Sequence, residues 1–205
     1  MKREEFYKNY WRYYCMLEKK FLTTVDFVEI DEKNFCCYSN EYALLLQSVG
    51  AELDNIFKLY CDFDLTKRKT ILNYANTLLN DTPEITKQIV KVAGTDIELV
   101  PFKEWTIESP SKSLKWWVAF TNIKHNRNGN FVDAKQENVI NILSALFILE
   151  NMCLRKFAKV GTDGVLVEPD APDEPSKLFS LVDWKYRFIP IAEGLAFIDD
   201  GLCPY

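Results

Sequence analysis

The sequence has little glycine and proline, and it contains no glycine-rich nucleotide-binding motif. Its 205 residues include 7 Gly and 8 Pro, too few for a collagen-like or low-complexity chain. Neither G-x-x-x-x-G-K-[ST] nor G-x-G-x-x-G occurs, and the nearest candidate, Gly161 to Gly164, runs into the strand-like residues Val165–Val167. A phosphate-holding helix N-terminus is not expected there, which argues against a P-loop nucleotide hydrolase.

Histidine is scarce, and cysteine pairs with C-x-x-C spacing are absent. His125 is the single histidine, so zinc sites of the H-E-x-x-H type and paired-histidine metal cages cannot be built within one chain, although a dimer would supply a second copy. The six cysteines lie at positions 15, 36, 37, 61, 153 and 203, with no C-x-x-C spacing, and four of them fall in or beside predicted helices. We expect reduced core thiols and no metal or cofactor.

Long uninterrupted apolar runs are absent as well. The first residues, MKREEFYKNYWRYY, carry charges where a signal peptide is apolar. Polar residues break the apolar stretches well before the roughly 18 residues that a membrane span needs; these are Gln47, Glu52, Asn141 and Glu150. We expect a cytoplasmic protein that has no membrane partner.

The composition that remains is typical of a single globular domain covering residues 1–205. With 25 Lys and Arg against 30 Asp and Glu, the net charge is −5, and 48% of the residues are hydrophobic. A chain of this length buries roughly 70% of its unfolded surface in a single core. Aromatic residues reach 14%, which indicates a bulky core.

Apolar residues at three- and four-residue steps predict a mainly α protein. The predicted helices cover residues 3–28, 39–60, 66–79, 113–126 and 134–158. The first of them is expected to bury one apolar stripe, which consists of Phe6, Tyr10, Tyr13, Leu17, Phe21, Val25 and Val28. Ser39 is a suitable N-cap for the second helix, whereas Lys67, Arg68 and Lys69 would form a basic run on the outer face of the third. We predict an up-and-down bundle of four to five helices over residues 1–158.

A small β appendage is predicted beside this bundle. Two short apolar stretches around Gly94 indicate a hairpin inserted near 88–100. Residues 159–205 would form a C-terminal loop and strand extension, with a solvated, acidic, proline-rich loop at 168–175 and a strand at 185–191.

One segment of this acidic protein is basic. Residues 109–132 contain no Asp or Glu but do contain Lys112, Lys115, Lys124 and Arg127, so a phosphate-bearing ligand would be attracted there. Asn122 and His125 lie three residues apart and share a helix face, with Asn126 and Arg127 close by.

These residue types suit metal-independent cleavage of RNA. The reaction needs a group that titrates near neutrality and cations that hold the phosphorane charge. His125 would be the general acid/base, Lys124 and Arg127 would stabilise phosphate charge, and Asn122 would orient the imidazole or the phosphate. It is equally expected that His125 has no catalytic role, because a histidine at a helix C-terminus interacts favourably with the helix dipole.

The remaining candidate contacts to the substrate are Lys115, Asn126 and Trp117. Trp116 and Trp117 could stack on bases, but adjacent helical positions point about 100° apart, so at least one ring should fill the core.

The string W-W-x-x-F-x-N-I-K-H-N-R at 116–127, the long helices and the apolar helix at 134–158 resemble the HEPN superfamily of bacterial helical bundles. The resemblance spans residues 1–158. It implies a homodimer that brings two histidine motifs together and, in active members, metal-independent RNA cleavage in toxin-antitoxin or phage-defence systems. It also implies RNA, an antitoxin or another protein as a partner, since many members only bind.

The sequence departs from the HEPN signature at one position. The family places an arginine before the histidine, but the residues seven, six and five positions before His125 are Val118, Ala119 and Phe120. Only the histidine carries over, and Arg127 follows it. A non-catalytic module that binds a protein or nucleic acid therefore stands as the alternative to a ribonuclease.

A further alternative is a metal-dependent nuclease. Asp170, Asp183 and Lys185 match a P-D…D-x-K pattern in which two carboxylates hold Mg²⁺ and a lysine steadies the attacking water. That chemistry needs both carboxylates on adjacent strands, which a proline-rich loop does not offer. Asp62 and Asp64 form a D-x-D that we interpret as capping between helices.

Overall fold

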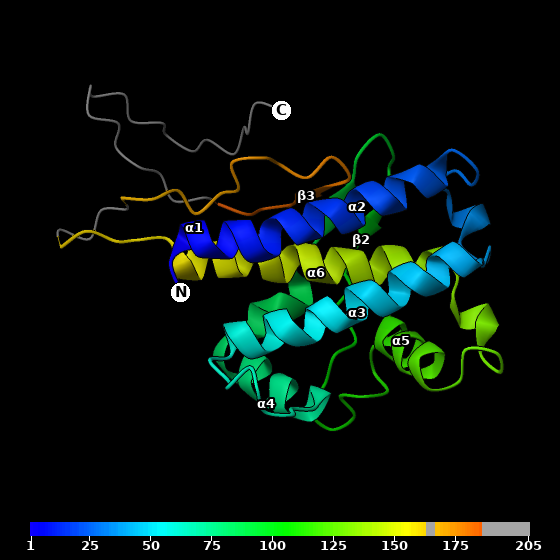
Figure 1. The fold of residues 1–205 in the computed structure, drawn as a ribbon, viewed down its shortest axis with the longest axis horizontal. Helices are drawn as coiled ribbons and strands as arrows, with labels where there is room; N and C mark the ends of the chain where they lie inside the picture. The colour runs from blue at the N-terminus through cyan, green and yellow to red at the C-terminus, as the bar shows by residue number, and fades with distance from the viewer. Residues whose placement is uncertain (163–166, 186–205) are drawn as a thin grey trace.

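The first helix is one continuous rod with an irregular turn near its start. A computed structural model describes residues 1–162 and 167–185. Within this rod, α1 (Arg3–Phe6) leads through a π-helical turn (Tyr7–Trp11) into α2 (Arg12–Val25). The rod ends at residue 25, three residues before the predicted end (Figure 1).

The π turn shifts which side chains of this rod face the core. A π turn adds one residue to a helical turn, so the residue buried after Phe6 is Trp11, five positions on. A regular helix would bury Tyr10 and Tyr13, as the apolar spacing predicts, yet Tyr13 is exposed and Trp11 and Tyr14 are fully buried. The predicted helix is confirmed, and Tyr10 is half-buried against Phe6, but the predicted buried face is wrong at Tyr13 and misses Trp11 and Tyr14.

The second and third helices differ in how well their starts were predicted. In α3 (Asn40–Tyr60), the Ser39 hydroxyl oxygen accepts a hydrogen bond from the Tyr42 N–H at 3.1 Å, as expected of an N-cap. The next helix, α4 (Ile71–Asp81), begins five residues later than predicted, because the Asn73 side chain accepts from the Thr70 N–H and fixes the start there. Residues 67–69 therefore lie in a loop and not on a helix face.

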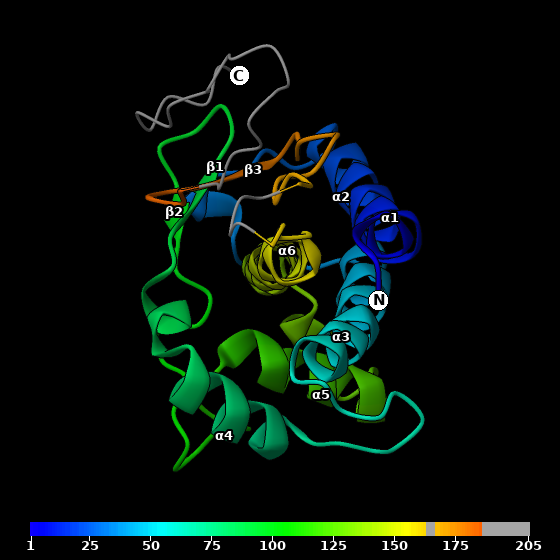
Figure 2. The ribbon, with the colours of Figure 1, turned by 90° about the vertical axis from the view of Figure 1, so that its left-hand side faces the viewer.

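The last helix forms the centre of the molecule. Figure 2 views the bundle nearly end-on, with α6 (Gln136–Phe157) surrounded by the first rod, α3, α5 (Lys115–Asn126) and the sheet. From Ile142 to Leu154 every residue of α6 is buried, which is typical of a core helix. By length and composition α6 could cross a membrane, but 89% of its apolar window is buried inside the fold.

The remaining elements are short. Turns of 3₁₀ helix occur at Glu32–Asn34, Pro83–Lys87 and Phe131–Asp133. Strands β1 (Val90–Val92) and β2 (Glu98–Leu99) form the predicted hairpin, with Gly94 at φ 73° in its turn. The mainly α class with a small β appendage is confirmed, since 55% of the residues that the structure describes are helical.

The third strand comes from a segment that the sequence did not indicate. β3 (Phe179–Leu181) pairs antiparallel with β1, so the order in the sheet is β2-β1-β3. The predicted strand at 185–191 lies outside the described residues from position 186 on, and residue 185 itself is not in a strand.

The acidic loop at 168–175 is tied down, which corrects its interpretation as a solvated loop. Asp170 is fully buried and pairs with Arg155 at 3.1 Å. Arg3 donates to the carbonyl oxygens of Pro169 and Ala171, both at 2.6 Å, and the Trp11 indole N–H donates to the carbonyl of Glu174. The loop thus covers the side of the first rod.

Candidate functional site

The basic segment is presented by α5, whose inner face is packed tightly against α3. Trp116, Phe120 and Ile123 are buried on that face. Gly50 of α3 lies so close that a Cβ there would stand 2.3 Å from the Phe120 ring. This close approach fixes the rotation of α5 and turns Lys115, Lys124 and His125 toward solvent.

The two tryptophans of α5 belong to the core more than to the surface. Trp116 is buried, and its indole N–H donates to the carbonyl of Pro101 at 2.7 Å. Trp117 is half-buried and makes edge-on ring contacts with Phe57, Trp116 and Phe120. Stacking of a base on Trp117 would have to compete with these contacts.

Asn122 and Asn126 are held by the turn that follows α5. The Asn122 amide donates to the carboxylate of Asp133 at 2.8 Å, and Asn126 Oδ1 accepts from the Gly129 N–H at 3.1 Å. Asn122 therefore positions the connection between α5 and α6, and this bond uses one of the two N–H donors of its amide.

The cationic side chains of this segment point outward. Lys124 lies 5.5 Å above the Phe120 ring, and Arg127 donates to the side-chain oxygen of Asn40 at 3.3 Å. His125, between them in sequence, is exposed. None of Lys112, Lys115, Lys124 and Arg127 forms an ion pair with a residue in the described ranges.

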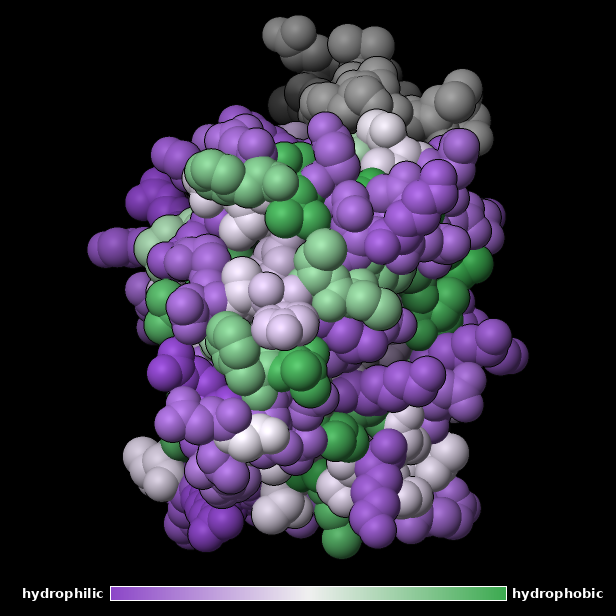
Figure 3. Space-filling model, turned by 90° about the vertical axis from the view of Figure 1, so that its right-hand side faces the viewer, coloured by the Kyte–Doolittle hydropathy of each residue, from purple (hydrophilic) through white to green (hydrophobic). Residues whose placement is uncertain are grey.

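The C-terminal end of α5 lies beside the connection between α2 and α3, and together they form one end of the bundle. We call residues 26–39 and 124–133 the end face (Figure 3). The rings of Tyr38 and Phe131 meet edge-on at 5.4 Å, and the Ser39 N–H donates to the carbonyl of Ala134. Apolar side chains are exposed among the polar ones, with Phe27 at 88% and Val132 at 61%.

The end face also holds two cysteines that the sequence did not mark as exposed. Cys36 and Cys37 are both exposed, which corrects the expectation of core thiols at these positions. Cys153 is buried as expected, whereas Cys15 and Cys61 are half-buried, and burial raises the pKa of each of these two thiols to about 12. Cys203 lies outside the described residues.

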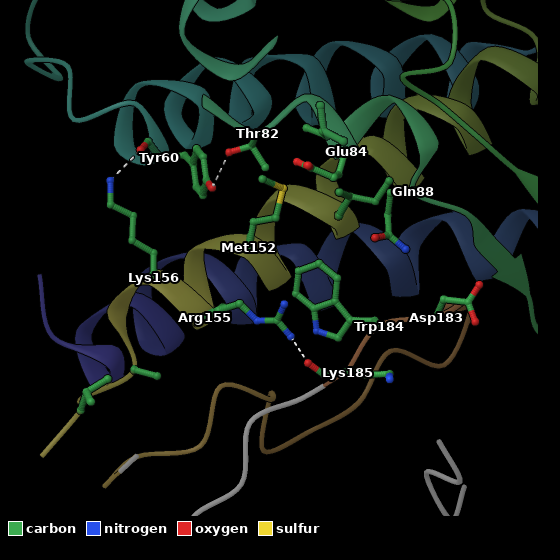
Figure 4. Close-up of a pocket in the computed structure, with 14 residues that line it drawn as sticks. Tyr60, Thr82, Glu84, Gln88, Met152, Arg155, Lys156, Asp183, Trp184 and Lys185 are labelled. Atoms are coloured by element: carbon green, nitrogen blue, oxygen red, sulfur yellow. Dashed lines mark hydrogen bonds between the residues drawn. The ribbon is translucent and has the colours of Figure 1, made fainter. Parts of the chain in front are cut away.

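A cavity of about 770 Å³ opens elsewhere, where α6 ends. Figure 4 shows the Trp184 ring beside Arg155, whose guanidinium lies 3.9 Å from the ring centre. Two of the three cations that line this cavity have partners: Lys156 bonds the Asp62 carboxylate and the Tyr60 carbonyl, and Arg155 bonds Asp170 and the Lys185 carbonyl. The charge available to an anionic ligand is correspondingly small.

The geometry does not favour a metal nuclease at this cavity. Asp183 and Lys185 line it, whereas the Asp170 carboxylate is buried against Arg155. Within residues 1–162 and 167–185, no group of three or more His, Cys, Asp or Glu could hold a metal ion.

Asp62 and Asp64, the D-x-D pair, lie in the loop that follows α3 and stabilise its backbone. Asp62, at φ 54°, occupies the left-handed position after α3, where the Phe63 N–H bonds back to the Lys58 carbonyl at 2.8 Å. Asp64 accepts from the N–H and hydroxyl of Thr66, which lowers the Asp64 pKa.

Two buried glutamates, which the sequence analysis did not single out, have opposite surroundings. Glu18 accepts hydrogen bonds from the Tyr14 and Ser176 hydroxyls and from the N–H groups of Lys177 and Leu178. Glu150 is fully buried, and neither of its carboxyl oxygens has a hydrogen-bond partner among the described residues. Burial, with the charge of Glu52 nearby, raises the Glu150 pKa well above its ordinary value.

Comparison with known proteins adds no relative to this picture. No protein-family model, curated protein or solved structure matches the chain.

Proposed function

We propose that this protein is a binding module for single-stranded RNA and that the exposed basic end of α5, with Lys124, His125 and Arg127, is its recognition surface. The other loop of the end face, residues 26–39, carries four exposed acidic residues and lies beside this surface: Asp26, Glu29, Asp31 and Glu32. The observation that supports the proposal is electrostatic. The segment 109–132 has no acidic residue, and its four cations form no ion pair to a described residue. Exposed cations that form no ion pair within the protein lose little when they bind phosphate.

The apolar part of the end face supports RNA as the partner. Exposed rings of Phe27 and Tyr38 lie in the same connection between α2 and α3, and the Tyr38 ring contacts Phe131, which follows the cationic end of α5. Single-stranded nucleic acids are bound by cations that follow the backbone and by rings on which bases stack. Double-stranded RNA offers its bases less openly, so single strands or loops fit this surface better.

Ribonuclease activity is the second candidate, favoured by the exposed imidazole of His125 between Lys124 and Arg127. In a single chain this surface is open, and Asn122 is bonded to Asp133. A second copy would have to supply the groups that enclose a scissile phosphate. This second proposal follows the resemblance to HEPN proteins. It includes what that resemblance implies: a homodimer, an antitoxin partner and a role in defence in the cytoplasm.

The test is fluorescence anisotropy with a labelled single-stranded RNA over a range of salt concentrations. Changing Lys124 and Arg127 together to Gln should remove two phosphate contacts, so the slope of log K against log salt becomes shallower by about 1.4. The matched control changes Lys67 and Arg68 to Gln. These residues lie after the far end of α3, a helix about 30 Å long, and the control should leave the slope unchanged. Equal effects of both pairs would exclude a specific surface.

A cleavage assay with the same protein tests the second candidate function, ribonuclease activity. Wild type and His125→Ala are incubated with the RNA in EDTA and resolved on a denaturing gel. Cleavage by wild type alone, leaving 2′,3′-cyclic phosphate ends, would support the ribonuclease. Intact RNA in both reactions, with binding retained, supports the binding module.

A further inference from the structure

Cys36 and Cys37 form an adjacent pair of exposed thiols on the end face. Of the five cysteines that the structure describes, they are the two exposed ones. The pair lies in the connection between α2 and α3, where the Cys37 N–H donates to the Asn34 carbonyl at 2.8 Å and the Cys37 carbonyl accepts from the Gln136 N–H at 2.9 Å. These bonds hold the thiols at the start of α6.

We propose that this pair is a site of reversible S-thiolation by a low-molecular-weight disulfide of the glutathione type. A cysteine thiolate attacks one sulfur of the small disulfide, so a protein–small-molecule disulfide forms while the original disulfide bond breaks. The departing thiolate takes a proton from water. The cysteine is oxidised and half of the small disulfide is reduced, so the exchange is balanced.

The structure gives the selectivity among the described thiols. Only a thiolate attacks, and at about pH 8 a thiol whose pKa is about 12 is ionised in roughly one molecule in ten thousand. Cys15 and Cys61 should therefore react slowly. Cys153 should also react slowly, because it is buried and burial raises its pKa well above the ordinary value. Cys36 and Cys37 are exposed and carry no such barrier of access.

Closure of the pair into an internal disulfide is opposed by geometry. Consecutive Cα atoms stand about 3.8 Å apart across a trans peptide, shorter than the roughly 4.4–6.8 Å that disulfides prefer. Rearrangement would also strain the two hydrogen bonds that hold Cys37. The mixed disulfide with the small thiol is therefore the product that accumulates.

The adduct would regulate the surface that carries the proposed function, and this part of the inference rests on that function. Asn40, which bonds Arg127, follows the pair by three residues, and the Tyr38 ring contacts Phe131 on the other side of the end face. A glutathione adduct brings a bulky group of net negative charge beside these cations. It should repel phosphate as well as block access.

The experiment uses the full chain with Cys203→Ser, because Cys203 lies outside the described residues. The reduced protein is incubated with oxidised glutathione, and adducts are located by intact and peptide mass spectrometry. We expect rapid modification at Cys36 or Cys37, its loss in Cys36→Ser/Cys37→Ser, its persistence in the control Cys61→Ser, and reversal by a reducing agent. Modification at equal rates in the double serine variant would overturn the site.

RNA affinity is measured on the same samples. Thiolation should weaken binding about tenfold or more at low salt, and reduction should restore it. Thiolated protein that binds RNA as tightly as reduced protein overturns the regulatory part. Reduced protein that binds no RNA overturns the proposed function, while the mass spectra still decide the modification site.

Discussion

Glu150 offers the sharpest test of the physical reasoning, because a buried carboxyl group without partners must stay protonated. The change is Glu150→Gln, which keeps the shape of the side chain and removes its ionisation. In the folded protein burial raises the Glu150 pKa well above the ordinary value of 4.5. In the unfolded chain the group titrates near that ordinary value.

The sign of the pH dependence follows from this difference. The folded state binds the Glu150 proton more tightly than the unfolded state does. The resulting stability is complete below about pH 4.5 and is lost as pH rises through the folded-state pKa. Each pH unit in this window lowers the free energy of unfolding by about 1.4 kcal/mol. Between about pH 5.5 and pH 8, wild type should lose up to about 3.4 kcal/mol relative to Glu150→Gln.

The assay is urea unfolding followed by tryptophan fluorescence across this pH range, with the difference between variant and wild type taken at each pH. Taking the difference cancels the contribution of every group that titrates alike in both proteins. Glu52 belongs to these groups as long as its electrostatic coupling to Glu150 is small. A difference that stays constant with pH would refute the reasoning, because it would mean that Glu150 ionises equally in both states.

The matched control is Glu18→Gln. Glu18 is equally inaccessible, but both of its oxygens accept hydrogen bonds, and Lys177 N–H donates to one of them at 3.0 Å. An amide cannot accept at both positions, so this variant should lose about 1–3 kcal/mol at neutral pH. At about pH 8 the two glutamates should thus respond in opposite directions, and a common response would show that burial alone governs both.

Three further predictions concern packing and ion pairs, each measured by urea unfolding. Gly50→Ala should lose about 1–3 kcal/mol by forcing α5 outward at Phe120, whereas Ala51→Gly, exposed on the same helix, should lose at most about 1 kcal/mol; equal losses would contradict the close approach. Asp170→Asn should cost about 1.5–3 kcal/mol by weakening the charged hydrogen bond from Arg155, whereas Asp62→Asn, whose side chain is 78% exposed, should cost about 1 kcal/mol or less. Trp117→Leu should lower stability by about 1–3 kcal/mol and leave RNA affinity unchanged, and a weakened affinity of the folded variant would indicate base stacking.

The sequence predicted the helices well where apolar spacing and caps agree. Ser39 and the apolar steps after it define α3 to within a residue, and the turn at Gly94 defines the hairpin. The prediction failed at the π turn, since the spacing of Phe6, Tyr10 and Tyr13 fits a regular helix equally well. Only the packing of Trp11 against distant rings decides between the two phases.

The candidate site was predictable only in part. The absence of acidic residues at 109–132 is visible in the sequence, and the exposure of Lys124 and His125 follows from the helical phase. The partners of Asn122 and Arg127 depend on long-range packing, and so does the exposure of Cys36 and Cys37. Nothing in their local sequence separates these two thiols from buried ones.

The attachment of residues 169–178 to the first rod has a consequence for the order of folding. Arg3, Trp11 and Glu18 find hydrogen-bond partners more than 155 positions later in the chain. During synthesis the rod can form as an isolated helix, but these polar groups remain without those partners until nearly the whole chain has left the ribosome. Contacts of such sequence separation slow the formation of the native state. The N-terminal helix should therefore be among the first elements to form and among the last to dock.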